Sequence, residues 1–66
     1  MTQKMYRELV EGDVFVIAGR EFVVASEPVT ERGITRWNTA TVSGKLLGPA
    51  SSISTDEVDV LRNVSV

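Results

Sequence analysis

The 66-residue sequence contains no cysteine and no histidine. Without cysteine, neither a disulfide nor a thiolate metal site supports the core. Without histidine, the commonest metal ligand and the usual general base of enzymes are both missing. These absences exclude ordinary zinc sites and catalysis by Ser–His or Cys–His pairs. We therefore expect neither a metal nor a cofactor.

Long apolar runs are lacking as well. The longest covers residues 14–18, whereas a membrane-spanning helix needs about 20 apolar residues and a signal peptide about 7 to 15. Seven basic residues against nine acidic ones give a formal net charge of −2. This balance disfavours non-specific DNA binding, which depends on Lys and Arg contacts with phosphates. We expect a soluble, cytoplasmic protein that does not bind membranes.

Catalytic groups have no recognisable arrangement. The five glycines are scattered singly, so the sequence has no Gly-rich phosphate loop. Lys4 and Lys45 could replace histidine as a base only if desolvated, and their spacing singles out neither. The carboxylates of Asp56, Glu57 and Asp59 lack the spacing of a calcium loop. We expect no enzymatic activity, and therefore a protein that acts by binding.

Residues 12–26, GDVFVIAGREFVVAS, are instead rich in Val, Phe and Ile, which favour β-strands. Gly19 and Arg20 predict a two-residue hairpin turn with glycine at its first central position. In that register Ile17 faces Phe22. Four large apolar side chains then share one side, which we expect to be the core: Phe15, Ile17, Phe22 and Val24.

The opposite side of this hairpin is also apolar, since it carries Val14, Val16 and Val23. Two interpretations of what covers it stay open. In the first, the N-terminal arm (residues 1–11) or the C-terminal tail (residues 63–66) folds over it. The arm has apolar residues four apart, which fits one helical turn. In the second interpretation, this face binds another subunit or a partner protein.

A polar loop over residues 30–33 precedes a predicted strand over residues 34–42. On that strand Trp37 shares one side with the threonines, and we expect this side to face solvent. A tryptophan folded into the core through a bulge is the alternative.

The remaining sequence predicts a short strand at residues 46–47 and a break at Gly48 and Pro49. Ser54, followed by Glu57 three residues later, is typical of a helix start, and a last strand covers residues 58–62.

These elements predict one all-β domain over residues 1–66, with a barrel at residues 12–62. The stretch LVEGDVFVIAGREFVV, residues 9–24, resembles the opening of KOW and translation-protein barrels. These are small barrels of the Src-homology-3-like (SH3-like) superfold. The turn before VDVL, residues 58–61, is similar to the helical turn that precedes their last strand. The resemblance implies five strands and one short helical turn; an oligonucleotide-binding-type (OB-like) barrel is the alternative.

Binding surfaces remain as the source of function. We expect a protein-interaction or self-assembly module that docks through the face of Val14, Val16 and Val23 or through the face of Trp37. Tryptophan and arginine are the residue types enriched at interface hot spots. A protein partner or a homo-oligomer is therefore the expected assembly.

A second interpretation is a KOW-like nucleic-acid binder. In it, bases stack on Trp37 while Arg20, Arg32 and Arg36 hold the phosphates. The net acidity disfavours this interpretation, and the sequence lacks the basic loops that RNA-binding members of those barrel families carry. A third interpretation, suggested only by the small size and general character of the chain, is a virion or accessory protein of a bacteriophage.

Overall fold

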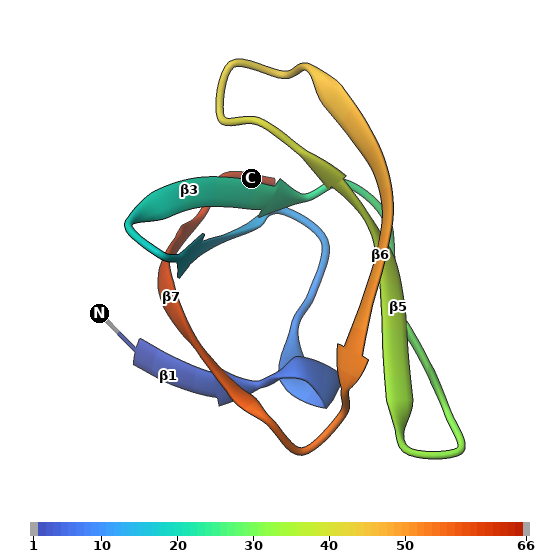
Figure 1. Ribbon diagram of the computed structural model, residues 1–66. Coiled ribbons are helices and arrows are strands. Elements are labelled where there is room, and N and C mark those ends of the chain that lie inside the picture. The colour runs from blue at the N-terminus through green and yellow to red at the C-terminus, as the bar shows by residue number, and fades with distance from the viewer. Residues whose placement is uncertain (1, 66) are drawn as a thin grey trace.

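The computed structural model describes residues 2–65 and shows one antiparallel sheet of seven strands (Figure 1). The strands are β1 (Thr2–Met5), β2 (Asp13–Ile17), β3 (Arg20–Val24), β4 (Val29–Glu31), β5 (Ile34–Ala40), β6 (Leu46–Ile53) and β7 (Glu57–Asn63). A short 3-10 helix, η1 (Tyr6–Glu8), follows β1. The sheet order is β1-β7-β2-β3-β5-β4, and β6 pairs with β5. The sheet curls into a half-barrel (Figure 1).

The expectation of an all-β fold is confirmed, but the expectation of five strands is wrong. The first added strand comes from the N-terminal arm, because Thr2–Met5 pairs with β7. The second, β4, forms because the chain turns at Arg32 and Gly33 and returns as β5. Both turn residues have positive φ, 53° and 78°, as a two-residue hairpin turn with a primed geometry requires.

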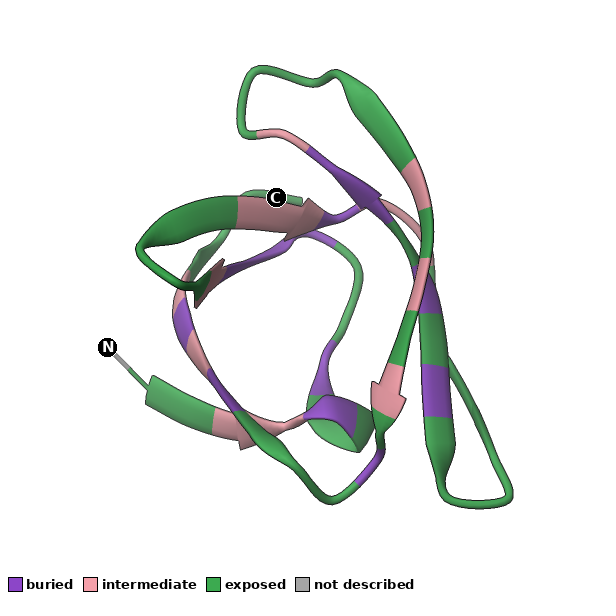
Figure 2. Cartoon of the chain, viewed as in Figure 1, coloured by how far each residue is buried: buried purple, intermediate pink, exposed green. Residues whose placement is uncertain are grey.

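The β2–β3 hairpin has the expected strands in a different register. Phe15 pairs with Phe22, and Ile17 pairs with Arg20, so that the turn residues are Ala18 and Gly19. The pairing differs from the expected one by two positions. Because side chains alternate with a period of two, such a shift leaves each of them on its own face. Figure 2 shows that burial falls toward the hairpin tip, where Ile17 is 46 % exposed and lies outside the core.

The turn residue Ala18 has φ 52°, a left-handed conformation that costs a non-glycine residue about 1–2 kcal/mol. Asparagine tolerates this conformation better and is favoured before glycine in such turns. Ala18→Asn should therefore raise the free energy of unfolding by about 0.5–1 kcal/mol, read from urea denaturation. Gly19→Ala, at φ 77°, should lower it. A drop in stability for Ala18→Asn would contradict the assigned turn.

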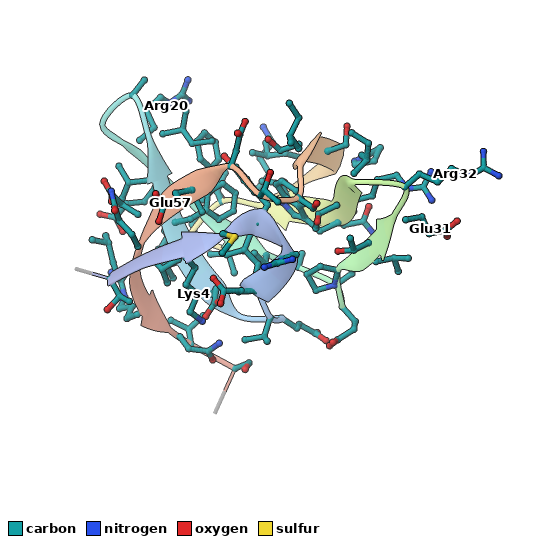
Figure 3. The ribbon with its side chains drawn as sticks, turned by 90° about the horizontal axis from the view of Figure 1, so that it is seen from below. Lys4, Arg20, Glu31, Arg32 and Glu57 are labelled. Carbon is teal, nitrogen blue, oxygen red and sulfur yellow. The ribbon has the colours of Figure 1, made fainter. Side chains whose placement is uncertain are left out.

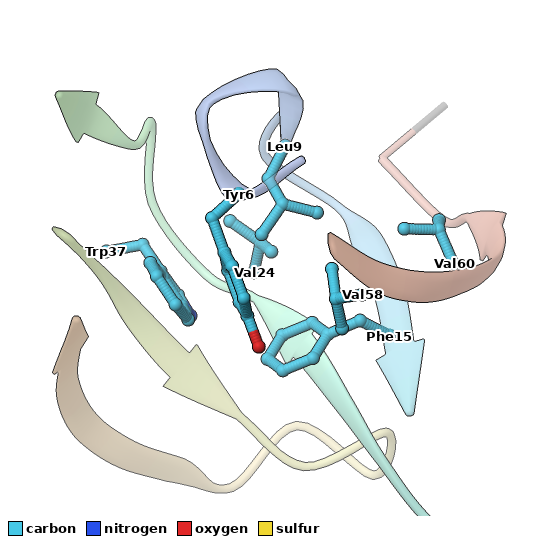
Figure 4. Close-up of a cluster of buried hydrophobic side chains, with 7 residues drawn as sticks. All are labelled: Tyr6, Leu9, Phe15, Val24, Trp37, Val58 and Val60. Carbon is cyan, nitrogen blue, oxygen red and sulfur yellow. The ribbon is translucent and has the colours of Figure 1, made fainter. Parts of the chain in front are cut away.

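The core lies on the concave side of the half-barrel (Figure 4). Seven buried side chains form one cluster: Tyr6, Leu9, Phe15, Val24, Trp37, Val58 and Val60. The Trp37 ring stacks on Tyr6 at a centroid distance of 5.3 Å and meets the Phe15 ring edge-on at 5.9 Å. Residues from both halves of the chain therefore build one interior.

The expectation that Trp37 faces solvent is wrong, since it is 5 % exposed. Thr35 and Thr39 lie on the same side of β5 and are buried with it, so the predicted alternation is correct and only its direction is reversed. The physical reason is the curl of the sheet, which makes the threonine-rich side concave. Tyr6, brought there by η1, then covers the indole ring.

The second face of the β2–β3 hairpin carries an ion pair. Val14 is fully buried, and its neighbours across the sheet are Arg62 of β7 and Val23 of β3. The Arg62 guanidinium reaches Glu21 Oε1 at 3.3 Å. Since β2 lies between β7 and β3, the stem of Arg62 must pass over β2 to make this contact, and it shields the valines from water.

The arm does not cover this face with its large apolar residues, because Tyr6 and Leu9 join the core on the opposite side. The arm interpretation is therefore wrong for these two residues. In the tail, Val64 is 52 % exposed, whereas Val66 lies outside the described residues, so the tail interpretation stays a prediction.

The predicted helical turn before the last strand is a hydrogen-bonded turn instead. The Asp56 N–H donates to the Ile53 carbonyl at 3.1 Å. Ser54 is buried, and its backbone donates to Gly33 and accepts from Arg7. These long-range bonds use the backbone groups that a helix would need. The one helical element of residues 2–65 is η1 in the arm.

The predicted break at Gly48 and Pro49 is also wrong, because both lie inside the eight-residue strand β6. Pro49 stands opposite Asn38 of β5. The backbone of Asn38 bonds to Ala25 and Ser26, on the far side of β5 from β6. This pair therefore makes no bond across the β5–β6 ladder, and the missing N–H of proline disturbs nothing.

A buried carboxylate ties both ends of the chain to β2. Asp13 is 1 % exposed. Its Oδ2 accepts from Lys4 Nζ and from the Val10 N–H, each at 3.0 Å. Its Oδ1 accepts from Asn63 Nδ2 at 2.9 Å. The first and last strands are thus joined through one side chain.

Candidate binding cleft

The residues expected to bind a partner are not brought together on one surface. Trp37 lies in the interior, whereas Arg36, next to it in sequence, lies on the outer side of β5 and contacts Glu31 at 3.5 Å. Arg20 begins β3 beside the β2–β3 turn, whereas Arg32 lies on the β4–β5 turn at the opposite end of the molecule (Figure 3). The stacking surface and the cations required by the nucleic-acid interpretation are therefore separated.

The valine face is not an open apolar surface either. Val14 is inaccessible, and Val16 and Val23 are half-buried on the side of the sheet where Arg62 bonds to Glu21. A partner would have to break this ion pair before it reached the valines. Trp37 and Val14 are thus buried, whereas Val16 and Val23 stay partly exposed.

A cleft of about 390 Å³ opens on the concave side of the half-barrel. Its walls are aromatic on one side, from Tyr6, Phe15, Phe22 and Trp37. On the other side it is bordered by β6, from Leu47 to Ser52. Ile17 and Leu47 also line it and are about half exposed, at 46 % and 51 %, so the cleft opens to solvent between them.

The cleft exists because the inner side of β6 carries small residues. By register, Gly48, Ala50 and Ser52 face the same side as Thr39, Trp37 and Thr35 of β5. Each is only half-buried. Side chains of this size leave room in front of the aromatic walls that a valine or leucine would occupy.

The cleft carries no charge, because none of its lining residues is ionisable near neutral pH. Arg20 comes closest to the aromatic wall, with its guanidinium carbon 5.8 Å from the centre of the Phe22 ring. A hollow on the outer side of the sheet differs in this respect, since Glu27, Glu31 and Arg36 line it. The concave cleft therefore favours uncharged, apolar groups.

Two polar atoms of residues that line the cleft have no hydrogen-bond partner among residues 2–65. They are Trp37 Nε1 and Thr39 Oγ1, both buried, and both residues line the cleft. Leaving a buried polar group unpaired costs about 1–3 kcal/mol, so such groups are few in native proteins and need an explanation. An apolar cleft with two unpaired polar groups has the composition of a binding site.

Sequence reasoning missed Tyr6, Leu47 and Ala50 as cleft residues. One interpretation of the sequence places the arm, which contains Tyr6, over the valine face and not the aromatic face. Leu47 and Ala50 lie on β6, where Gly48 and Pro49 predict a break in place of a strand. Residues 48–52, Gly-Pro-Ala-Ser-Ser, contain no alternation of large and small side chains that would mark a strand. The aromatic residues Phe15 and Phe22 were found, but as core alone.

The acidic residues that the sequence groups at positions 56–59 do not line the cleft. Asp56 is exposed on the turn before β7, and Glu57 is exposed at the start of β7. Within residues 2–65, no three Asp or Glu side chains cluster closely enough to hold a metal ion. The same residues include no helix with the length and apolarity to cross a membrane.

Comparison of the chain with protein-family models, with curated proteins and with solved structures finds no match.

Proposed function

We propose that this protein is a non-enzymatic protein-interaction or self-assembly module that binds an uncharged, extended polypeptide segment in its concave cleft. The position of Trp37 Nε1 and Thr39 Oγ1 carries the proposal. Both atoms are buried, and they belong to residues that line a mainly apolar cleft. A carbonyl or hydroxyl group of a bound segment would supply their missing partners after a small shift of the surrounding side chains.

The strand β6 supports the same proposal. Among residues 2–65 it pairs with β5 only, so its other edge is free, and this edge runs along the cleft. Extended segments bind to such edges through main-chain hydrogen bonds, while neighbouring pockets select alternate side chains. The cleft and the edge together therefore suit a polypeptide better than a small molecule.

We further propose that the half-barrel is a variant of the SH3-like small barrel. Five of its strands match those expected from the sequence, namely β2, β3, β5, β6 and β7. These five are consecutive neighbours in the order β7-β2-β3-β5-β6. Along the chain, β2 is the first of the five and β7 the last, and these two strands pair with each other. The strands β1 and β4 are additions at the margins of this arrangement.

Selection from a random peptide library displayed on phage, with the biotinylated protein as bait, tests the function. We expect enriched peptides that are poor in charged residues and shift the emission of the single tryptophan on binding. Leu47→Glu places a charge at the exposed rim of the cleft and should weaken binding of the enriched peptides at least tenfold.

Asn38→Glu is the matched control, because it adds the same charge on the outer side of β5 and should leave the affinity unchanged. The affinities of the two variants can be compared only if each variant unfolds at the same urea midpoint as the original protein. The function is wrong if no sequence is enriched, or if the enriched peptides bind the Leu47→Glu variant as tightly as the original protein.

A further inference from the structure

Strand β6 has a free edge whose backbone groups can be assigned residue by residue. Its partner residue Asn38 points its backbone groups away from β6, toward Ala25 and Ser26. Backbone groups alternate direction along a strand, so the residues of β6 opposite Asn38, Arg36 and Ile34 point theirs to the free edge. These residues are Pro49, Ser51 and Ile53.

The free edge thus offers an unusual set of donors and acceptors. Pro49 has a carbonyl but no N–H. Ser51 has both groups, and neither is used in a turn or loop bond. Ile53 has a free N–H, but its carbonyl already accepts from Asp56. The edge therefore lacks a donor at Pro49, and at Ile53 its carbonyl acceptor is already used by Asp56.

This set is complementary to itself. If two β6 edges meet antiparallel about Ser51, the two Ser51 residues exchange both of their hydrogen bonds. Each Ile53 N–H then donates to the Pro49 carbonyl of the other chain. At each end of the pairing one bond is lost, because the Pro49 nitrogen has no hydrogen to donate to the Ile53 carbonyl, which already accepts from Asp56. Pro49, which normally protects an edge, here excludes other registers.

The side chains of β6 agree with this pairing. A two-fold axis brings each residue against the same patch of its copy, so a charged strand would meet its own charge. Residues 46–53 carry no charge. In the assigned register, the apolar Ile53, 54 % exposed, faces Pro49 of the other chain. Of the other marginal strands, β1 carries Lys4 and β4 carries Glu31, as protected edges do.

We propose that two copies of this chain pair through β6 in an antiparallel, two-fold arrangement centred on Ser51. This inference rests on the proposed function and names its partner as a second copy. Six of the eight residues of β6, Leu47 to Ser52, border the cleft, so the paired strand lies along its mouth. The dimer extends the sheet from β5 and β6 of one chain to β6 and β5 of the other.

Single-cysteine variants test the register, since the chain has no cysteine of its own. In the assigned register, two Ser51→Cys residues lie about 5.5 Å apart between Cα atoms, within the disulfide range. Two Ile53→Cys residues are offset by four positions, roughly 13 Å at 3.3 Å per residue. We expect the Ser51→Cys disulfide dimer to form at least tenfold faster under mild oxidation, after correction for maleimide reactivity.

A mixture of Pro49→Cys and Ile53→Cys chains should form mixed dimers preferentially. In sedimentation equilibrium, the original protein should dimerise with concentration, and Ser51→Pro should remain a monomer. Proline at position 51 removes a free-edge N–H without touching the ladder to β5, and an unchanged urea midpoint shows that it still folds.

A strictly monomeric original protein, or equal oxidation rates for Ser51→Cys and Ile53→Cys, would overturn the pairing. If peptides that bind the cleft are nevertheless enriched, the proposed function stands without it. If neither dimers nor enriched peptides are found, both proposals fail.

Discussion

Trp37→Ala is expected to leave the chain largely unfolded at 25 °C. A 66-residue domain has a free energy of unfolding of about 3–10 kcal/mol. Trp37 is 5 % exposed and stacks on Tyr6, and truncating such a residue to alanine costs about 3–5 kcal/mol. The loss is therefore comparable with the whole stability of the domain.

Far-ultraviolet circular dichroism during urea denaturation measures this loss directly. Trp37→Phe keeps an aromatic ring beside Tyr6 and removes the unpaired Nε1, so it should cost clearly less than the alanine variant. Before any mutation, the tryptophan emission of the folded protein should be blue-shifted and should move to the red in urea. A solvent-exposed emission spectrum in the folded state would contradict the interior position of Trp37.

Asp13→Ala is expected to lower the free energy of unfolding by about 3 kcal/mol, since hydrogen bonds to a charged group contribute about 1.5–3 kcal/mol each. The variant loses the contacts with Lys4, the Val10 N–H and Asn63. The contribution of Lys4 is the smaller part, because its side chain is 30 % exposed and water replaces the carboxylate.

Glu31→Ala is the control, because it breaks an ion pair in which both side chains are more than 60 % exposed. We expect it to change stability by less than about 0.5 kcal/mol. Urea midpoints of the two variants should therefore lie far apart. Similar midpoints would show that Asp13 does not anchor the chain ends.

The same carboxylate should make the protein sensitive to acid. Burial acts to raise the pKa of Asp13, but hydrogen bonds from Asn63, Val10 and Lys4, together with the charge of Lys4, outweigh burial. The pKa therefore lies below its ordinary value of 3.8. The unfolded chain takes up the proton first as the pH falls, so the stabilisation is complete well above pH 3.8 and is lost on passing through the lower, folded pKa.

Urea denaturation between pH 6 and pH 2 measures this dependence. Asp13→Asn lacks the titrating group, and its stability should fall less steeply over the acid part of the range than that of the original protein. Parallel pH profiles for the two proteins would show that other carboxylates account for the acid sensitivity.

The alternation of side chains predicts which residues share one side of a strand. It does not predict which of the two sides faces the interior. Alternation correctly groups Phe15 with Phe22 and Trp37 with Thr35 and Thr39. It survives an error in the turn position because a two-residue shift preserves the faces. Which face becomes concave depends on the curl of the whole sheet and on Tyr6, which comes from a distant part of the chain. Neither is visible in a local pattern.

The cleft escaped prediction for a related reason. Gly48 and Pro49 are local turn signals, but the position of Pro49 opposite Asn38 leaves its nitrogen at a free edge. Only the tertiary pairing shows that a strand continues through them. Likewise, the cover of Val14 required an ion pair between Arg62 and Glu21, 41 positions apart in the chain.

The small side chains on the inner side of β6 have a consequence for the evolution of the molecule. Filling the space in front of Trp37 with a larger residue at Ala50 would add apolar contacts, which commonly stabilise a small domain. Selection for thermal stability alone would therefore favour larger side chains that fill the cleft. Ala50 leaves open a space that a larger side chain could fill, whereas Gly48 is required by its φ of 115°.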